Sequence, residues 1–82
     1  MNNYDNNYYS TSDLALASAL VCYGFVIECL EKDQSGRVAF YFVRQSALDG
    51  TTQAFWANTL TVNPRTYFDA IKHLKTRIYS EA

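Results

Sequence analysis

The chain has 82 residues, with seven Lys or Arg side chains against eight Asp or Glu side chains, so its formal net charge is −1. Hydrophobic residues make up 49% of it, a proportion typical of globular proteins, which excludes a disordered charged polypeptide. The length supports one domain with a small core, and no apolar run approaches the roughly 20 residues needed to span a bilayer.

The first residues predict a tail outside the core. Residues 1–7 are rich in Asn and carry neither a positive charge nor an apolar run, so we expect a flexible tail and no signal peptide. The folded domain is then expected to cover residues 8–82. Tyr8 and Tyr9 fit a short extended segment that leads into the first helix.

A helix is predicted over residues 12–23. Thr11 and Ser12 supply hydroxyl groups for its N-terminal cap, and Gly24 suits the left-handed position at its end. The helix is apolar nearly all round, with one narrow stripe of small side chains formed by Ala15, Ser18, Ala19 and Cys22. Such a stripe allows close approach of another backbone, which is either a neighbouring helix of the same chain or a partner molecule.

Residues 25–31 and 37–44 predict a β-hairpin, because both are rich in β-branched and aromatic residues and a turn sequence separates them. A four-residue loop would pair Lys32 with Arg37. This register places one apolar set on a single face, namely Phe25, Ile27, Cys29, Val38, Phe40 and Phe42. The other face then carries a mixed set, namely Val26, Glu28, Leu30, Ala39, Tyr41 and Val43.

Residues 46–58 give the weakest pattern. Residues 49–52 resemble a turn, and residues 53–58 fit a short helix or an irregular loop anchored by Phe55 and Trp56. No choice between these two conformations follows from the residues.

The last helix is predicted over residues 64–80, and residues 60–62 fit a third, short strand before it. Asn63 suits the N-cap, and Pro64 suits the first helical position. Apolar residues then recur at helical spacing at Tyr67, Phe68, Ile71, Leu74 and Ile78. The sequence thus predicts an α+β domain, in which a small antiparallel β-sheet packs against two long helices.

The residues indicate no enzyme chemistry. Cys22 and Cys29 are expected to be buried free thiols in a reducing cytoplasm, without a neighbouring cation to activate them. His73, the single histidine, is expected on the exposed side of the last helix. Glu28 lies opposite Tyr41 in the predicted register, where a hydrogen bond is the simple explanation and a general acid the alternative. We therefore expect no enzyme, no cofactor, no metal and no membrane association.

Two kinds of partner fit the sequence. A protein partner, or a second copy in a homodimer, is favoured because a core of this size hides only part of the aromatic surface and a small sheet has open edges. The candidate contact residues are Tyr41, Trp56, Tyr79, Ala15 and Ala19. The same tyrosines also fit as lids over the core, with their hydroxyl groups in water.

The alternative partner is nucleic acid, bound weakly by the last helix. Its candidate residues are Arg65, Lys72, Lys75 and Arg77. The chain as a whole lacks the basic character usual for binding to phosphates. The strand that begins at Arg37 also departs from the aromatic RNA-binding motif, since Val38 stands where that motif has glycine.

Several motifs together resemble a family of small domains of unknown function found in bacteria, archaea, phages and other mobile elements. They are Tyr9-x-Thr11-x-Asp13-Leu14-Ala15-Leu16-Ala17, Gly24-Phe25, Phe40-x-Phe42, Phe55-Trp56, Pro64-Arg65 and Leu74-Lys75-x-x-Ile78-Tyr79. The resemblance covers about residues 8–79 and consists mainly of caps and core positions. It implies a mobile-element setting and a role in binding proteins or nucleic acid, and it supplies no catalytic residue.

Overall fold

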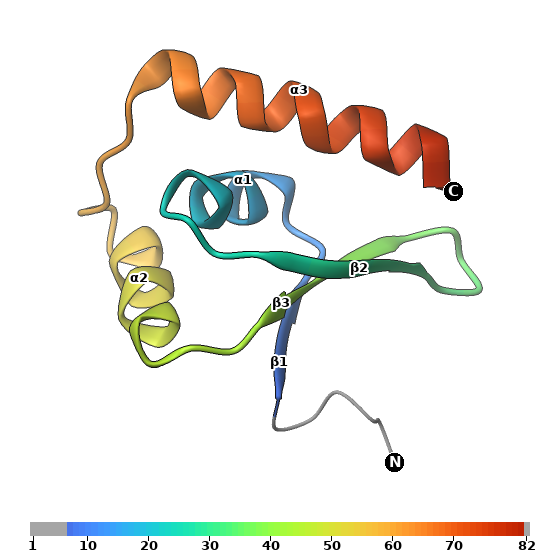
Figure 1. Ribbon diagram of the computed structural model, residues 1–82, viewed down its shortest axis with the longest axis horizontal. Helices are drawn as coiled ribbons and strands as arrows, with labels where there is room; N and C mark the ends of the chain where they lie inside the picture. Colours follow the sequence, from blue (N-terminus) through green and yellow to red (C-terminus); the bar gives the residue numbers. More distant parts are fainter. Residues whose placement is uncertain (1–6, 82) are drawn as a thin grey trace.

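The structure is a computed structural model that describes residues 7–81, so the predicted tail lies, apart from Asn7, outside the described residues. The elements follow one another as β1 (Tyr8–Thr11), α1 (Leu14–Cys22), β2 (Ile27–Lys32), β3 (Val38–Val43), α2 (Ser46–Trp56) and α3 (Pro64–Glu81). The strands form one antiparallel sheet in the order β1-β3-β2. Helix α1 lies between the sheet and α3, and α2 lies beside the sheet (Figure 1). The predicted α+β class is confirmed.

Helix α1 is apolar nearly all round because it is the central element. Its five residues from Leu16 to Leu20 are all buried, since the sheet, α2 and α3 cover different sides of it. The helix begins at Leu14, two residues later than predicted. Asp13 is the cap, and its Oδ1 accepts from the amides of Ala15 and Leu16 at 2.9 and 3.2 Å. The predicted hydroxyl cap is wrong, because Thr11 Oγ1 accepts from the amide of Asp13 at 3.0 Å and not from an amide of the first turn.

The third strand is β1, and the prediction of a strand at residues 60–62 is wrong. Strand β1 pairs with β3 from Tyr8 opposite Val43 to Thr11 opposite Phe40. Residues 60–62 instead lie in the connection from α2 to α3. That connection leaves α2 through Asn58, whose φ of 63° turns the chain away from the helix.

The predicted hairpin forms, but its register is wrong by one residue near the loop. Lys32 lies opposite Val38, and a bulge at Glu28 restores the predicted pairing of Ile27 with Phe42. Leu30 therefore faces the core opposite Phe40. The longer loop is stabilised by the carboxylate of Asp33, whose Oδ1 accepts from the amides of Ser35 and Arg37, each at 2.9 Å.

The bulge exchanges two neighbours on β2. Cys29 lies opposite Tyr41, on the face away from the core, where the prediction has Glu28. The predicted Glu28–Tyr41 pairing is accordingly wrong. Phe40 and Phe42 are buried, as predicted, and they join Leu16 from α1 and Leu74 from α3 in one core.

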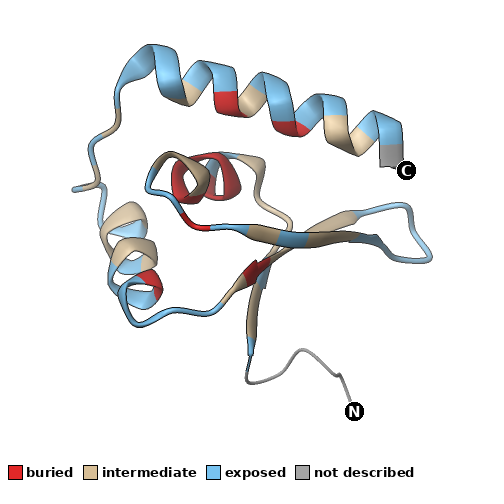
Figure 2. Cartoon of the chain, viewed as in Figure 1, coloured by how far each residue is buried: buried red, intermediate tan, exposed pale blue. Residues whose placement is uncertain are grey.

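Helix α3 is capped as predicted, because Asn63 Oδ1 accepts from the amide of Thr66 at 3.0 Å. The side toward α1 carries Tyr67, Ala70, Ile71, Leu74 and Ile78. Figure 2 shows the exposed residues along the opposite, outer side. Phe68 is on that outer side, 60% exposed, so its predicted place in the core stripe is wrong. Helix α3 packs mainly on α1, and the strip that it buries is too narrow to include Phe68.

Helix α2 replaces the turn expected at residues 49–52, because tertiary packing overrides the local preference of Gly50. Leu48 is fully buried in the core cluster. Phe55, two helical turns later, packs against the same cluster. These two anchors hold the helix on α1, although Gln45 at its N-terminus makes no side-chain capping bond.

Two glycines give opposite predictions for the same substitution. Gly24 has a φ of +90° after α1, whereas Gly50 is helical, and an added Cβ meets no atom within 4 Å at either position. Gly24→Ala is expected to destabilise the domain by about 1 kcal/mol, and Gly50→Ala to stabilise it by about 0.5–1 kcal/mol. Urea unfolding followed by circular dichroism measures both. A loss of stability in Gly50→Ala would contradict the helical assignment.

Candidate functional site

The three strands carry a second set of side chains on the face opposite the core. We call this surface the open sheet face, and it consists of Tyr8, Ser10, Val26, Cys29, Glu31, Ala39, Tyr41 and Val43. Val26 belongs to it because the amide of Val43 donates to the carbonyl of Val26 at 3.1 Å. None of these side chains packs against the core cluster. Within residues 7–81, α1 and α3 lie on the other side of the sheet, and α2 lies beside it (Figure 1).

The composition of the open sheet face is unusual for a surface in contact with water. In an antiparallel sheet with one face in water, the outward residues are normally polar and alternate along each strand with the buried apolar residues. Here the outward positions include two tyrosines, two valines, an alanine and a cysteine. Val26 is 56% exposed, and Tyr41 and Val43 are half-buried. An apolar patch of this kind is characteristic of a surface that a partner covers.

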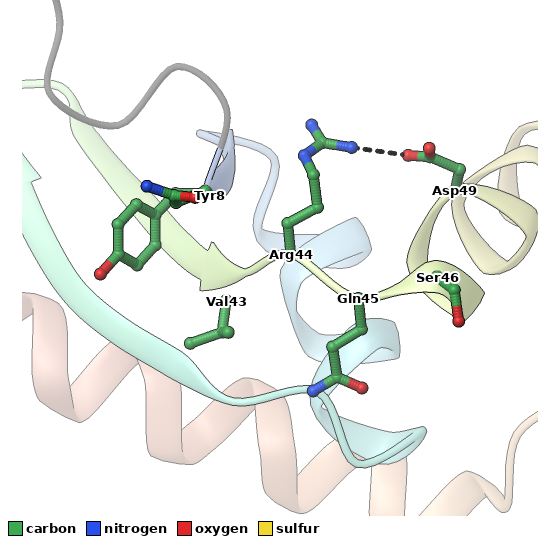
Figure 3. Close-up of a pocket in the computed structure, with 7 residues that line it drawn as sticks. Tyr8, Val43, Arg44, Gln45, Ser46 and Asp49 are labelled. Atoms are coloured by element: carbon green, nitrogen blue, oxygen red, sulfur yellow. Dashed lines mark hydrogen bonds and ion pairs between the residues drawn. The ribbon is translucent and has the colours of Figure 1, made fainter.

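A polar hollow of about 540 Å³ lies at one end of the open sheet face. Tyr8 and Val43 from the face line it together with Arg44, Gln45 and Asp49. Figure 3 shows Arg44 extending from the end of β3 toward Asp49 on α2, and the ion pair between them measures 3.0 Å. The pair is exposed, so it adds charge of both signs to this end but little stability.

A second hollow, of about 220 Å³, lies at the hairpin end of the same face. Ala39 and Tyr41 line it beside four charged residues, Glu31, Lys32, Asp33 and Arg37. The hydroxyl of Ser35 donates to Asp33 Oδ1 at 2.7 Å, and this bond is the main reason that the pKa of Asp33 lies below its usual value. The carboxylate therefore stays ionised, and this end also combines both signs of charge.

The residues predicted to contact a protein partner do not gather at one place. Tyr41 belongs to the open sheet face, Trp56 ends α2 at 63% exposure, and Tyr79 lies on the outer side of α3 at 81% exposure. Ala19 is buried, and the hydroxyl of Tyr67 on α3 donates to the carbonyl of Ala15 at 3.1 Å. This placement favours the intramolecular explanation of the small-residue stripe.

The residues predicted to contact nucleic acid divide into two groups. Arg65, Lys72 and Lys75 are exposed on α3, whereas Arg77 is half-buried. Lys72 Nζ lies 5.2 Å from the ring centroid of Phe68, an exposed aromatic residue that the sequence reasoning had assigned to the core.

Sequence reasoning missed Tyr8 and the apolar character of the open sheet face as a site. The signal was present in the alternation of β3, where Ala39, Tyr41 and Val43 alternate with the buried phenylalanines. It could not be extended to Tyr8, because no pairing rule in the sequence placed residues 8–11 beside β3.

Of the groups considered for catalysis, Cys29 lies on this face, Glu28 is exposed in the bulge beside it, and Cys22 and His73 lie on α1 and α3. Both cysteines are free and half-buried, and burial raises the pKa of the Cys22 thiol, which opposes formation of the reactive thiolate. His73 is exposed on α3, as predicted. Among the residues that the structure describes, no three His, Cys, Asp or Glu side chains form a metal-binding group.

None of the helices in the described part of the chain combines the length and the apolar character needed to cross a membrane. A family model described as "Domain of unknown function (DUF5659)" matches residues 6–80. This match confirms the resemblance to a family of small domains of unknown function. No curated protein and no solved structure gives a significant match to the chain.

Proposed function

Since the chain belongs to the DUF5659 family, whose description names no activity, we propose its function from its surface: it is a non-catalytic protein-binding module whose binding surface is the open sheet face. The observation that carries the proposal is the apolar character of this face, with Tyr41 at its centre and Val26 and Val43 toward one end. Covering these side chains removes apolar area from water, which stabilises a complex by about 25 cal/mol for each Å².

The partner that fits this face best is a second copy of the chain. A two-fold axis that lies in the interface, perpendicular to the strands at Tyr41, places Tyr41 of one copy on Tyr41 of the other. It also brings the Arg44–Asp49 end of one copy to the hairpin end of the other, which carries Asp33 and Arg37. Because each end has both signs of charge, the contact is complementary to itself. Nucleic acid is a poorer fit to this face, since phosphates need an excess of cations.

The size of the face sets the expected affinity. Three strands of at most six residues, spaced about 4.8 Å apart, form a surface of roughly 15 by 20 Å, so the interface is smaller than the range of about 1,200–2,000 Å² that standard specific complexes bury. We therefore expect a dissociation constant in the micromolar range. The mobile-element setting implied by the resemblance is compatible with such a small adaptor and is part of the same proposal.

Light scattering between about 1 and 100 μM protein, the range around the expected dissociation constant, tests the proposal. The mass is expected to rise from the monomer value of 9.4 kDa toward twice that value. Val26→Lys places a charge in the interface of each copy and is expected to raise the dissociation constant by at least about 10-fold, which corresponds to only about 1.4 kcal/mol. Val26 is exposed in the single chain, so its fold tolerates lysine.

The matched control is His73→Lys, which adds the same charge on the outer part of α3. It is expected to leave the mass unchanged at every concentration. A wild-type chain that stays at 9.4 kDa throughout, or a dimer that Val26→Lys leaves intact, would rule out self-association through the open sheet face.

A further inference from the structure

The outer side of α3 carries a second surface, separate from the open sheet face. Its members are spaced by three and four residues, so they form one row along the helix. We call this row the outer stripe, and it consists of Arg65, Phe68, Lys72, Lys75 and Tyr79. All five are exposed, and Phe68 and Tyr79 are 60% and 81% exposed. From Arg65 to Tyr79 the row is about 21 Å long, at 1.5 Å for each residue.

The outer stripe combines three cations with two aromatic rings and contains no carboxylate. Asp69 lies on its flank, one helical turn after Arg65, and is the acidic side chain nearest to it along the helix. Lys72 Nζ lies 5.2 Å from the centroid of the Phe68 ring, so a cation and a ring are already held next to each other. The core does not account for these rings, because α3 buries its opposite side against α1.

We propose that the outer stripe binds single-stranded nucleic acid, with bases stacked on Phe68 and Tyr79 and phosphates held by Arg65, Lys72 and Lys75. Every base presents a ring face, so stacking on exposed aromatic side chains is tolerant of sequence, and each stacked base contributes about 1–3 kcal/mol. The three cations supply the charge complementarity that the chain as a whole, with its net charge of −1, lacks.

Other anionic partners fit the outer stripe less well. A duplex keeps its bases paired and stacked, so the two rings have no base face to contact. A membrane surface requires a broad apolar helix face, whereas the apolar side of α3 is used by the fold. An acidic peptide satisfies the three cations but leaves both rings without a specific contact.

Arg77 is not part of this site. It lies on a half-buried side of α3, so only three of the four basic residues singled out from the sequence contribute. With three phosphate contacts, the logarithm of the binding constant is expected to fall with the logarithm of salt concentration at a slope of about −2. The binding is therefore weak at high salt and measurable at low salt.

Fluorescence anisotropy with a labelled 12-nucleotide oligothymidylate and a single-stranded RNA of the same length tests the proposal at low salt, near 20 mM, where phosphate contacts are strongest. Lys72→Glu combined with Lys75→Glu is expected to abolish binding. Phe68→Ala and Tyr79→Ala are each expected to weaken it by about 10-fold without changing the salt slope, because they remove stacking and no charge. Gln53→Glu, which adds a negative charge on α2 outside both proposed surfaces, is the control and is expected to bind like the wild type.

Three competitors separate the alternatives: a duplex of the same length, polyglutamate, and vesicles that contain phosphatidylserine. The proposal fails if neither oligonucleotide binds at low salt, or if any competitor displaces the oligothymidylate as well as unlabelled oligothymidylate does. It also fails if Phe68→Ala and Tyr79→Ala bind like the wild type. These results are independent of the proposed self-association, which Val26→Lys tests on the other side of the molecule.

Discussion

Phe42→Ala is expected to lower the free energy of unfolding by about 3–5 kcal/mol, a large part of the stability of a domain of this size. Phe42 is fully buried on the central strand, where it lies opposite Tyr9 on β1 and Ile27 on β2. Removing its ring leaves a cavity beneath α1 that the neighbouring strands cannot close. Urea unfolding followed by circular dichroism measures the loss.

Phe68→Ala is the matched control for this experiment, because it removes the same side chain from an exposed position. Its expected effect is within about 0.5 kcal/mol. If Phe42→Ala leaves too little folded protein for the measurement, Phe42→Leu is expected to cost about 1 kcal/mol and serves in its place. Similar losses in Phe42→Ala and Phe68→Ala would mean that α3 packs in another orientation.

The second large effect is expected at the bulge on β2. Leu30→Ala is expected to cost about 2 kcal/mol, because Leu30 packs against the core cluster opposite Phe40. Cys29→Ala is expected to cost about 0.5 kcal/mol or less, because the thiol lies on the open sheet face.

This pair of variants distinguishes the observed register from the register of a four-residue loop. In the latter, Cys29 faces the core and Leu30 faces outward, so the order of the two losses would be reversed. Unfolding is best measured at protein concentrations at which the chain is a monomer, since Cys29 lies in the proposed interface. A larger loss in Cys29→Ala than in Leu30→Ala would therefore eliminate the bulge at Glu28.

The parts of the fold that sequence reasoning predicted are those fixed by local chemistry. Asn63 and Pro64 start α3, Gly24 ends α1, and the alternation of β3 buries Phe40 and Phe42. Each of these signals depends on residues a few positions apart. The α+β class follows from these signals, because the helices and the sheet each have an apolar side that must pack against the other.

The parts that sequence reasoning missed depend on contacts between distant residues. Strand β1 exists because β3 offers it a free edge, and α2 is helical through Gly50 because Leu48 and Phe55 are anchored in the core. The bulge at Glu28 restores the pairing of Ile27 with Phe42 after the loop has shifted the register by one residue, so it depends on contacts between β2 and β3. Nothing within a short window of residues indicates these features.

The same distinction applies to the candidate sites. Arg65, Lys72 and Lys75 were recognisable as cations on one helix, since helical spacing is local. Phe68 could be assigned to the outer stripe only from the structure, which shows that the buried side of α3 does not include it. The open sheet face required the correct register and the position of β1, so only Tyr41 among its residues was selected in advance.

The central claim is that the open sheet face binds a second copy of the chain. Its most direct test is an isotope-filtered nuclear Overhauser experiment on an equal mixture of ¹³C-labelled and unlabelled protein, at a concentration well above the dissociation constant. The account predicts intermolecular cross-peaks between the two Tyr41 side chains, and from Val26 and Val43 in one copy to Cys29 and Ala39 in the other. Cross-peaks only from Phe68 and Tyr79 on α3, or no intermolecular cross-peaks from the open sheet face, would contradict it.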